Sequence, residues 1–369
     1  MKKIFSLLVA LAMVLSMGAC GKKESMESDS SVVSADSGQN VRESADREDS
    51  GSEENPSDES SQEPAHYPVT LTDQAGRAVT IAEEPEKLVS GYYISTSLLI
   101  ALNLEEKIVG IEAKADKRAI YRLSAPELTR LPNVGSAKEF DLEGCAALEP
   151  DLVILPLKLR NAADTLEELG ISVLLVNPEN QDLLNEMIRL IGAATDTEAR
   201  AEELLSHTAA QEERLGEKLE GAEAPKVYLA GNSSMLSTAG DAMYQSDLIR
   251  LAGGVNAAAE ITDTYWVEIS YEQLLAWNPE YIILASDAAY SAEDVLADPN
   301  LADCDAVLNG QVYQMPNRAE AWDSPVPGGI LGAVWLAGIL HPDLYPPAAC
   351  DEVIDEYYET FYGFVYSEN

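Results

Sequence analysis

The sequence predicts an α/β protein with two lobes, each built on a parallel sheet, joined by a single long α-helix. From residue 88 onward, short apolar runs of strand length alternate with helix-like stretches, which is typical of βαβ units. The run EGCAALEPDLVIL at 143–155 is matched by EQLLAWNPEYIIL at 272–284, an offset of 129 residues. Between the two copies, residues 197–220 are polar, free of Pro and contain a single Gly, which suits one long helix.

The first twenty residues predict export and lipidation. Lys2 and Lys3 precede an apolar run at 4–15, which is too short to span a bilayer permanently. A basic start, a short apolar core and small residues before a cleavage site make a secretory signal. The small residues directly before Cys20 resemble the lipobox of bacterial lipoproteins. We therefore predict a lipoprotein signal peptide at 1–20 with Cys20 lipidated; the alternative is an ordinary signal peptide with an incidental cysteine.

Residues 21–65 have the composition of a disordered tether. They hold twelve Ser, thirteen acidic residues, four basic residues and no aromatic residue. Such a segment cannot bury enough apolar surface to offset the entropy lost on ordering. The whole chain carries a formal net charge of −40, which argues against nucleic acid as a partner and favours solubility.

The two lobes are predicted to occupy residues 66–196 and 223–369, with a joining helix at 197–222. The first lobe is predicted to begin with a β-hairpin over 69–81. The alternative interpretation of the joining segment is a surface helix that belongs to one lobe. Strands are expected at 88–90, 108–111, 152–155, 173–176, 227–230, 282–285 and 312–315. Helices are expected at 162–169, 245–252, 271–276, 331–340 and 351–361.

The internal repeat places one glutamate at an equivalent position in each lobe. Glu143 and Glu272 each open a short helix that is followed by a Pro-acid turn and an apolar strand. Ser270 and Gln273 have the spacing of a capping box at the second helix. The two glutamates are interpreted either as matched docking charges or as carboxylates that stabilise a helix N-terminus.

Candidate ligand contacts follow the predicted strands, because open parallel sheets bind ligands beyond the carboxyl ends of their strands and clefts between lobes are common pockets. The folded part contains eighteen Lys and Arg, and nine of them lie within 107–160. These bases are either anion-binding groups or ordinary solvated loop charges. The aromatic and basic candidates are Tyr92, Tyr93, Arg118, Lys158, Arg160, Tyr244, Trp266, Arg318 and Trp322.

The remaining reactive residues predict neither a metal site nor a catalytic site. Histidine occurs only at 66, 207 and 341, too scattered in sequence for a first-row metal site. Cys145, Cys304 and Cys350 share no metal-ligand spacing and are expected to be buried thiols, with a Cys304–Cys350 disulfide as the alternative. The Asn-Ser-Ser run at 232–234 lacks the Gly-x-Ser-x-Gly pattern of α/β-hydrolases.

An ordered set of motifs resembles the iron-complex and cobalamin-type binding proteins of ABC importers. The resemblance spans about residues 69–362, and the ordered set is far more specific than any single motif. The motifs are DQAGRAVT at 73–80, PNVGS at 132–136, DLE at 141–143, LEPDLV at 148–153, LAGGVN at 251–256, ISYE at 269–272, NPE at 278–280, NGQVY at 309–313, WDSPVP at 322–327 and LHP at 340–342.

This resemblance implies a class III periplasmic-binding-protein fold, with two Rossmann-like lobes and little hinge motion on binding. It implies that Glu143 and Glu272 dock against arginines of an ABC permease dimer, which works with its ATPase. It also implies a ligand such as a ferric siderophore, haem, cobalamin or an oxyanion, and no cofactor of the protein itself. We expect a monomer, anchored by lipid to the extracytoplasmic face of the cell membrane.

Two other classes of protein fit parts of the sequence. A ligand-binding sensor or surface module without a transporter would share the fold and the cleft. A lipid-anchored hydrolase is the second alternative, although His341 is the sole histidine after the Asn-Ser-Ser run. An adjacent permease and ATPase gene pair would favour transport over both.

Overall fold

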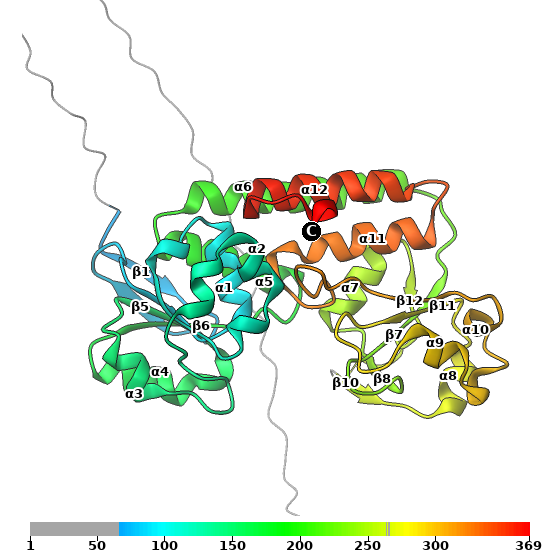
Figure 1. The fold of residues 1–369 in the computed structure, drawn as a ribbon, viewed down its shortest axis with the longest axis horizontal. Coiled ribbons are helices and arrows are strands. Elements are labelled where there is room, and N and C mark those ends of the chain that lie inside the picture. The colour runs from blue at the N-terminus through cyan, green and yellow to red at the C-terminus, as the bar shows by residue number, and fades with distance from the viewer. Residues whose placement is uncertain (1–65, 263, 265) are drawn as a thin grey trace, which may run out of the picture. The chain divides into compact units, whose positions relative to one another are not determined.

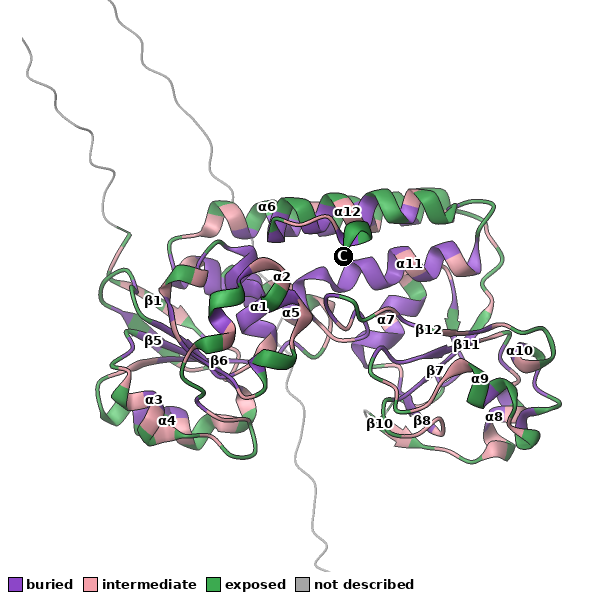
Figure 2. Ribbon diagram, viewed as in Figure 1, coloured by how far each residue is buried: buried purple, intermediate pink, exposed green. Residues whose placement is uncertain are grey.

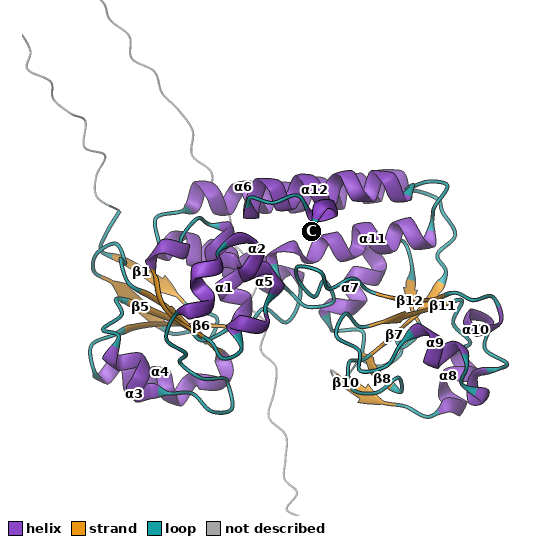
Figure 3. Cartoon of the chain, in the orientation of Figure 1, coloured by secondary structure: helices purple, strands orange, loops and turns teal. Residues whose placement is uncertain are grey.

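The structure is a computed structural model that describes residues 66–262, 264 and 266–369, all within one compact unit, Gln62–Asn369. It confirms the predicted α/β fold of two lobes, each with a sheet flanked by helices (Figures 1 and 3). The predicted signal peptide, Cys20 and tether lie outside the described residues. In the described part of the chain, no helix is both long and apolar enough to cross a membrane.

The first lobe contains a four-stranded parallel sheet in the order β4-β3-β5-β6, preceded by the hairpin β1–β2. Its strands are β1 (Val69–Thr72), β2 (Ala78–Ile81), β3 (Leu88–Ser90), β4 (Ile108–Ile111), β5 (Leu152–Pro156) and β6 (Ser172–Val176). Its helices are α1 (Tyr93–Ala101), α2 (Ala119–Ser124), α3 (Leu142–Ala147), α4 (Arg160–Glu168) and α5 (Gln181–Ala194).

The central strand β5 is buried along its whole length because helices cover both faces of the sheet. Leu152 and Ile154 belong to the core that includes residues of α1 and α5, whereas Val153 and Leu155 pack with residues of α3 and α4. The alternation follows from the two-residue period of a strand. A parallel sheet covered on both faces therefore produces the continuous apolar runs seen in the sequence.

The second lobe contains a six-stranded sheet in the order β10-β8-β7-β11-β12, with β9 also paired to β7. Its strands are β7 (Lys226–Ala230), β8 (Ser237–Ala239), β9 (Val255–Asn256), β10 (Trp266–Glu268), β11 (Tyr281–Leu284) and β12 (Val312–Gln314). Its helices are α7 (Tyr244–Leu251), α8 (Tyr271–Trp277), α9 (Ala292–Leu296), α10 (Asp305–Leu308), α11 (Ile330–Leu340) and α12 (Pro347–Tyr362).

The second sheet is not wholly parallel, which corrects one feature of the predicted fold. Strands β7, β9, β11 and β12 are parallel, but β8 runs antiparallel to β7 and β10 antiparallel to β8. Only the short segment 231–236 separates β7 from β8. A crossover between parallel strands needs a dozen or more residues. This shorter connection therefore returns the chain antiparallel.

Helix α6 (Glu198–Lys218) joins the lobes as one uninterrupted helix of 21 residues, about 32 Å long. Helix α12 runs beside it (Figure 1), and the Arg200 guanidinium lies 4.5 Å from the ring centroid of Phe361. The last turn of α12 also contacts the first lobe, where the hydroxyls of Ser97 and Tyr362 lie 2.9 Å apart. One apolar core continues through α1, α5, α6, α11 and α12, and α11 is buried on nearly every side (Figure 2).

The three cysteines of the described residues are free thiols. Cys145, Cys304 and Cys350 are all buried, so the alternative of a Cys304–Cys350 disulfide does not describe this structure. Burial raises the pKa of the Cys145 and Cys350 thiols to about 11. At neutral pH these two side chains are therefore uncharged apolar groups of the core.

Candidate functional site

A cavity of about 460 Å³ is lined by both lobes at the carboxyl ends of four parallel strands. The first lobe contributes residues that follow β3 and β4, and the second contributes residues that follow β11 and β12. The two sides meet at the cavity, where the Ile120 N–H donates a hydrogen bond of 3.2 Å to the Ala319 carbonyl. Clefts at this end of parallel sheets are where such folds bind ligands.

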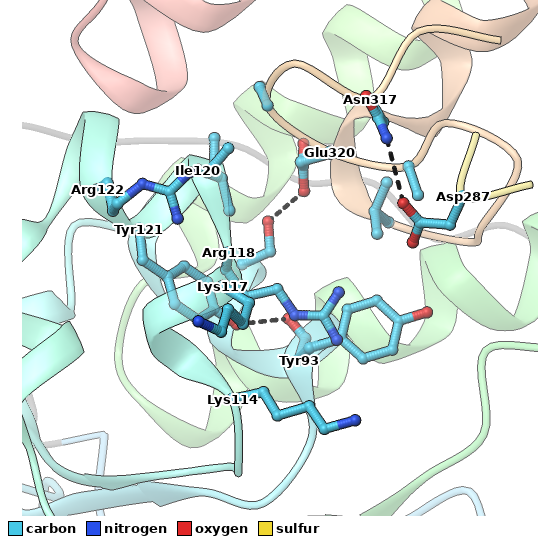
Figure 4. A pocket seen from close by; sticks show the side chains of 15 residues that line it. Tyr93, Lys114, Lys117, Arg118, Ile120, Tyr121, Arg122, Asp287, Asn317 and Glu320 are labelled. Carbon is cyan, nitrogen blue, oxygen red and sulfur yellow. Dashed lines mark hydrogen bonds between the residues drawn. The ribbon is translucent and has the colours of Figure 1, made fainter. Parts of the chain in front are cut away.

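Basic side chains dominate the first-lobe wall of the cavity: Lys114, Lys117, Arg118 and Arg122 (Figure 4). They lie on a short segment that turns sharply after β4. Lys114 has a positive φ of 68°, which lets a single helical turn, Ala115–Lys117, begin close behind the strand. Arg118 then precedes the first residue of α2. This compact turn brings four bases of a strongly acidic chain to one wall.

The central carbon of the Arg118 guanidinium lies over the Tyr93 ring, 4.2 Å from its centroid (Figure 4). Among the described residues, no carbonyl or carboxylate accepts a hydrogen bond from this guanidinium or forms an ion pair with it. A guanidinium has five N–H donors in a planar fork, which matches the oxygens of a carboxylate or an oxyanion. Arg118 thus lies against an aromatic ring, and within the described part of the chain its N–H donors have no acceptor, which leaves them available to a ligand.

The second-lobe wall carries acidic and amide groups opposite these bases. Asp287 accepts a hydrogen bond of 3.2 Å from the Asn317 side chain, and Glu320 lies deeper, with 6% of its surface exposed. Burial raises the pKa of Glu320 to about 7, although hydrogen bonds from Ser97 and Tyr358 and the charge of Arg118 oppose this rise. The cavity therefore combines fixed positive charge with one carboxyl that titrates near neutral pH.

The structure brings only part of the predicted ligand-binding set to this cavity. Tyr93 and Arg118 line it, and Tyr92 packs edge-on against Tyr93 with ring centroids 5.3 Å apart. Lys158 and Arg160 also follow a strand, β5, but do not line this cavity. Arg160 is exposed and donates a hydrogen bond of 2.9 Å to a backbone carbonyl of the β1–β2 turn.

Three further predicted contacts also lie away from the cavity wall. Tyr244 is buried at the start of α7, with its hydroxyl against Gly329. Trp266 is 43% exposed on strand β10. Arg318 follows β12 but stacks its guanidinium on Tyr366 and donates a hydrogen bond to the carbonyl of Asn369. Tyr244 and Arg318 follow strands and Trp266 begins one, but none of these three side chains lines the cavity.

Trp322 is a core residue, with 1% of its surface exposed. Its indole N–H donates a hydrogen bond of 2.9 Å to the Tyr358 hydroxyl, and its ring lies 5.4 Å from that of Tyr366. We expect Trp322→Ala to lower the free energy of unfolding by about 3–5 kcal/mol, because it leaves a large cavity and removes the hydrogen bond that the Tyr358 hydroxyl accepts. Urea unfolding measures this loss. Trp266→Ala is the control and should change stability little; an unaltered midpoint in Trp322→Ala would contradict the core assignment.

Ser97 and Glu320 are cavity residues that the sequence pattern did not single out. Ser97 lies inside α1, and Glu320 lies within a loop that also carries the buried Trp322. Their hydroxyl and carboxyl oxygens are 2.5 Å apart, although the residues are 223 positions apart in sequence. No local pattern links two such positions, so only the tertiary fold identifies them.

Glu143 and Glu272 occupy equivalent positions in the two lobes. Helices α3 and α8 begin 129 residues apart, at Leu142 and Tyr271, and so do strands β5 and β11. The backbone conformation is also repeated. Glu149 and Asn278, which directly precede the proline of each copy, both have positive φ, 50° and 45°. Both glutamates are exposed. In Figure 1, α3 and α8 lie on the side of their lobes away from α6 and α12.

The capping at these two helices is simpler than expected. Asp141 accepts a hydrogen bond from the Gly144 N–H, and Ser270 accepts one from the Gln273 N–H. The second half of the predicted capping box is missing, because the Gln273 side chain reaches Glu260 instead. A hydrogen bond from its own backbone N–H and one from Ser270 hold the pKa of Glu272 below its usual range.

The structure also brings one histidine together with two acidic residues, although the sequence predicted no metal site. Side-chain N and O atoms of His66, Asp196 and Glu198 lie within 4.8 Å of one another at the surface. Glu198 is the first residue of α6, and Asp196 lies two residues before it. The His66 ring nitrogen is 3.3 Å from the Glu198 carboxylate and 3.1 Å from the Ala193 carbonyl. The group is distant in sequence from every residue of the cavity wall.

Comparison with known proteins places this architecture in one family. Residues 88–319 match the periplasmic binding protein family. The molybdate-binding protein MolA of Haemophilus influenzae is 26% identical over 324 residues, which cover 80% of this chain and 91% of MolA. An ABC transporter substrate-binding lipoprotein of Bacillus subtilis, YvrC, is 26% identical over 76% of this chain and 87% of its own length.

Solved structures agree with the sequence relatives. MolA with bound molybdate superimposes with a TM-score of 0.72, covering 80% of this chain and 98% of MolA. A periplasmic solute-binding protein from Veillonella parvula superimposes with a TM-score of 0.70 at 27% identity, covering 80% and 93% of the two chains. The chain therefore belongs to the periplasmic binding protein family, as a non-enzymatic solute-binding protein of the kind that serves ABC importers.

Proposed function

We propose that this protein captures a compact anionic solute, an oxyanion or a small anionic metal complex, in the cavity between its lobes. The observation that carries the proposal is Arg118, whose guanidinium faces the cavity and has no acceptor among the described residues. Three more bases surround it in a chain whose net charge is −40. Charge-assisted hydrogen bonds from a planar guanidinium are strong and directional toward anions.

The similarity to MolA supports an oxyanion as the first ligand to test. A tetrahedral oxyanion is small enough for a cavity of about 460 Å³ and presents several acceptor oxygens to the basic wall. A ferric siderophore, haem or cobalamin is the second candidate, since the Tyr93 ring offers an aromatic surface beside the bases.

The ligand is best identified by binding measurements on the full chain. We expect molybdate, tungstate or another oxyanion to bind in isothermal titration calorimetry and to appear as a mass shift in native mass spectrometry. Cobalamin, haem and a panel of ferric siderophores are measured in parallel. Binding of a neutral complex alone, with no competition by any oxyanion, would contradict the anionic class.

We further propose that Glu143 and Glu272 dock the loaded protein on an ABC permease dimer. The support is their equivalent placement in the two lobes, their exposure and their location on α3 and α8. A permease built from two like subunits needs one matched contact on each lobe. This docking role distinguishes an importer component from a free-standing sensor, which needs no such pair.

We also propose that a lipid on Cys20 anchors the protein at the extracytoplasmic face of the membrane, and that 21–65 act as the tether. The support is the pattern of the first twenty residues and the similarity to a B. subtilis protein described as a lipoprotein. Cys20→Ala is expected to move the protein from the membrane fraction to the soluble fraction, because no second apolar anchor follows in 21–65. A variant that remains in salt-washed membranes would refute the anchor.

A further inference from the structure

The cavity wall contains a buried carboxyl, Glu320, which is an unexpected group in an anion-binding site. It is 6% exposed, and its two oxygens accept hydrogen bonds from Ser97 at 2.5 Å and from Tyr358 at 3.3 Å. Among the described residues it forms no ion pair with Lys or Arg. An ionised carboxylate here would repel an anion held by Arg118 across the same cavity.

The charge state of Glu320 depends on the groups packed around it. Arg118 is the cation whose charge acts on it, and Asp287 is the other acid of the cavity wall. Lys114, Lys117 and Arg122 line the same cavity. Arg118 also acts on Glu112, and Asp323 is a buried acid three residues after Glu320; burial raises the pKa of both acids. Four neighbouring tyrosines stay neutral because burial raises their pKa: Tyr244, Tyr357, Tyr358 and Tyr362. Burial raises the pKa of Glu320 itself to about 7. The carboxyl is therefore much easier to protonate near neutral pH than an exposed glutamate.

An anion on Arg118 changes this balance in one direction. It neutralises the charge that favours ionised Glu320 and adds a negative charge nearby, and both effects favour the protonated carboxyl. A bound anion therefore raises the pKa of Glu320 further. By linkage, each unit of that rise makes the anion bind about tenfold more tightly to the protonated protein than to the ionised one.

The hydrogen bonds around Glu320 are compatible with both its ionised and its protonated form. The Ser97 hydroxyl lies between the Glu320 carboxyl and the Tyr362 hydroxyl, 2.9 Å from the latter. When Glu320 is ionised, Ser97 donates to it. When Glu320 is protonated, the Ser97 hydroxyl can accept a hydrogen bond from the carboxyl O–H and donate one to the Tyr362 hydroxyl, which itself donates to the Ser97 carbonyl at 3.3 Å. Apart from the proton added to Glu320, the two arrangements differ only in the rotation of hydroxyl groups.

We infer that the cavity takes up its anion together with one proton, which is held on Glu320. This inference rests on the proposed anion-binding function. Glu320 would then help the site to accommodate a doubly charged anion. Once protonated, its carboxyl no longer presents a negative charge to the ligand.

Calorimetry with molybdate on the full chain tests the inference, because molybdate remains a dianion from pH 6 to pH 9. For a one-unit rise in pKa, wild-type affinity should fall about tenfold from pH 6 to pH 9. Titrations in buffers of different ionisation enthalpy should show proton uptake by the protein at slightly alkaline pH. Glu320→Gln, which mimics the protonated carboxyl, should bind with the same affinity at every pH and take up no proton.

Two further variants separate a specific role of Glu320 from a general effect of buried acids. Ser97→Ala keeps the carboxyl but removes a donor to its ionised form, so the pH at which affinity falls should move upward. Glu112→Gln tests the other buried acid on which the charge of Arg118 acts; Glu112 is 5% exposed and accepts hydrogen bonds from Thr96 and Tyr121 but does not line the cavity. This variant should keep the wild-type pH dependence.

The outcomes also distinguish this inference from the function on which it rests. Molybdate or tungstate binding without proton uptake, or uptake that persists in Glu320→Gln, overturns the role of Glu320 and leaves the anion site intact. Loss of the pH dependence in Glu112→Gln overturns it as well. No binding of any oxyanion at any pH overturns both proposals together.

Discussion

Replacing Glu143 and Glu272 together with alanine is expected to reduce uptake in cells by more than tenfold, with ligand affinity and melting temperature nearly unchanged. Both carboxylates are exposed, lie on α3 and α8, and do not line the cavity. Exposed ion pairs contribute only about 0–1 kcal/mol each, but charge pairs desolvated at a docked interface contribute several times more. Arginine partners would add bidentate geometry to the charge.

The single variants and one control pair define how this result is interpreted. Each single change should give an intermediate uptake, because one of two matched contacts remains. Glu213→Ala with Glu217→Ala removes the same charge from the exposed side of α6 and should transport normally. Helix-dipole stabilisation alone predicts the opposite pattern, with lower stability and normal uptake. Normal uptake by the Glu143 and Glu272 double variant would therefore favour a free-standing binding module over an importer component.

Most strands of the two parallel arrays could be predicted from sequence because they are largely buried, whereas the short strands β8, β9 and β10 were not predicted. Runs such as 108–111 and 173–176 are apolar without alternation, and the structure places them in β4 and β6 of a covered parallel sheet. Helix α1 could not be predicted in this way. Its polar residues Ser95, Thr96 and Ser97 are as buried as its leucines, so it has no apolar stripe to detect.

The candidate site could be predicted only as a set of loops. The rule that ligands lie at the carboxyl ends of parallel strands led to the segment that contains Arg118. It led equally to Arg160, which binds a backbone carbonyl instead, and to Trp322, which is covered by residues of α12 and the C-terminal segment. Which side chain faces the cleft depends on contacts between segments distant in sequence, and one sequence contains no record of those contacts.

Arg118→Gln is expected to weaken oxyanion binding by about thirtyfold or more while leaving stability close to wild type. Removing one partner of a desolvated, hydrogen-bonded charge pair costs about 2–5 kcal/mol, and each 1.4 kcal/mol is a factor of ten in affinity. The folded protein itself loses little, because the guanidinium stacks on Tyr93 and has no hydrogen-bond acceptor among the described residues. Calorimetry and thermal unfolding on the same sample measure both quantities.

Two companion variants make the Arg118 result specific to guanidinium geometry at this position. Arg118→Lys keeps the charge but loses the planar fork, so its affinity should lie between those of wild type and Arg118→Gln. Arg160→Gln removes an equal charge from an exposed side chain outside the cavity and should bind like wild type. If Arg160→Gln weakens binding and Arg118→Gln does not, the ligand lies at the end of β5 rather than between the lobes, and the proposed cavity is wrong.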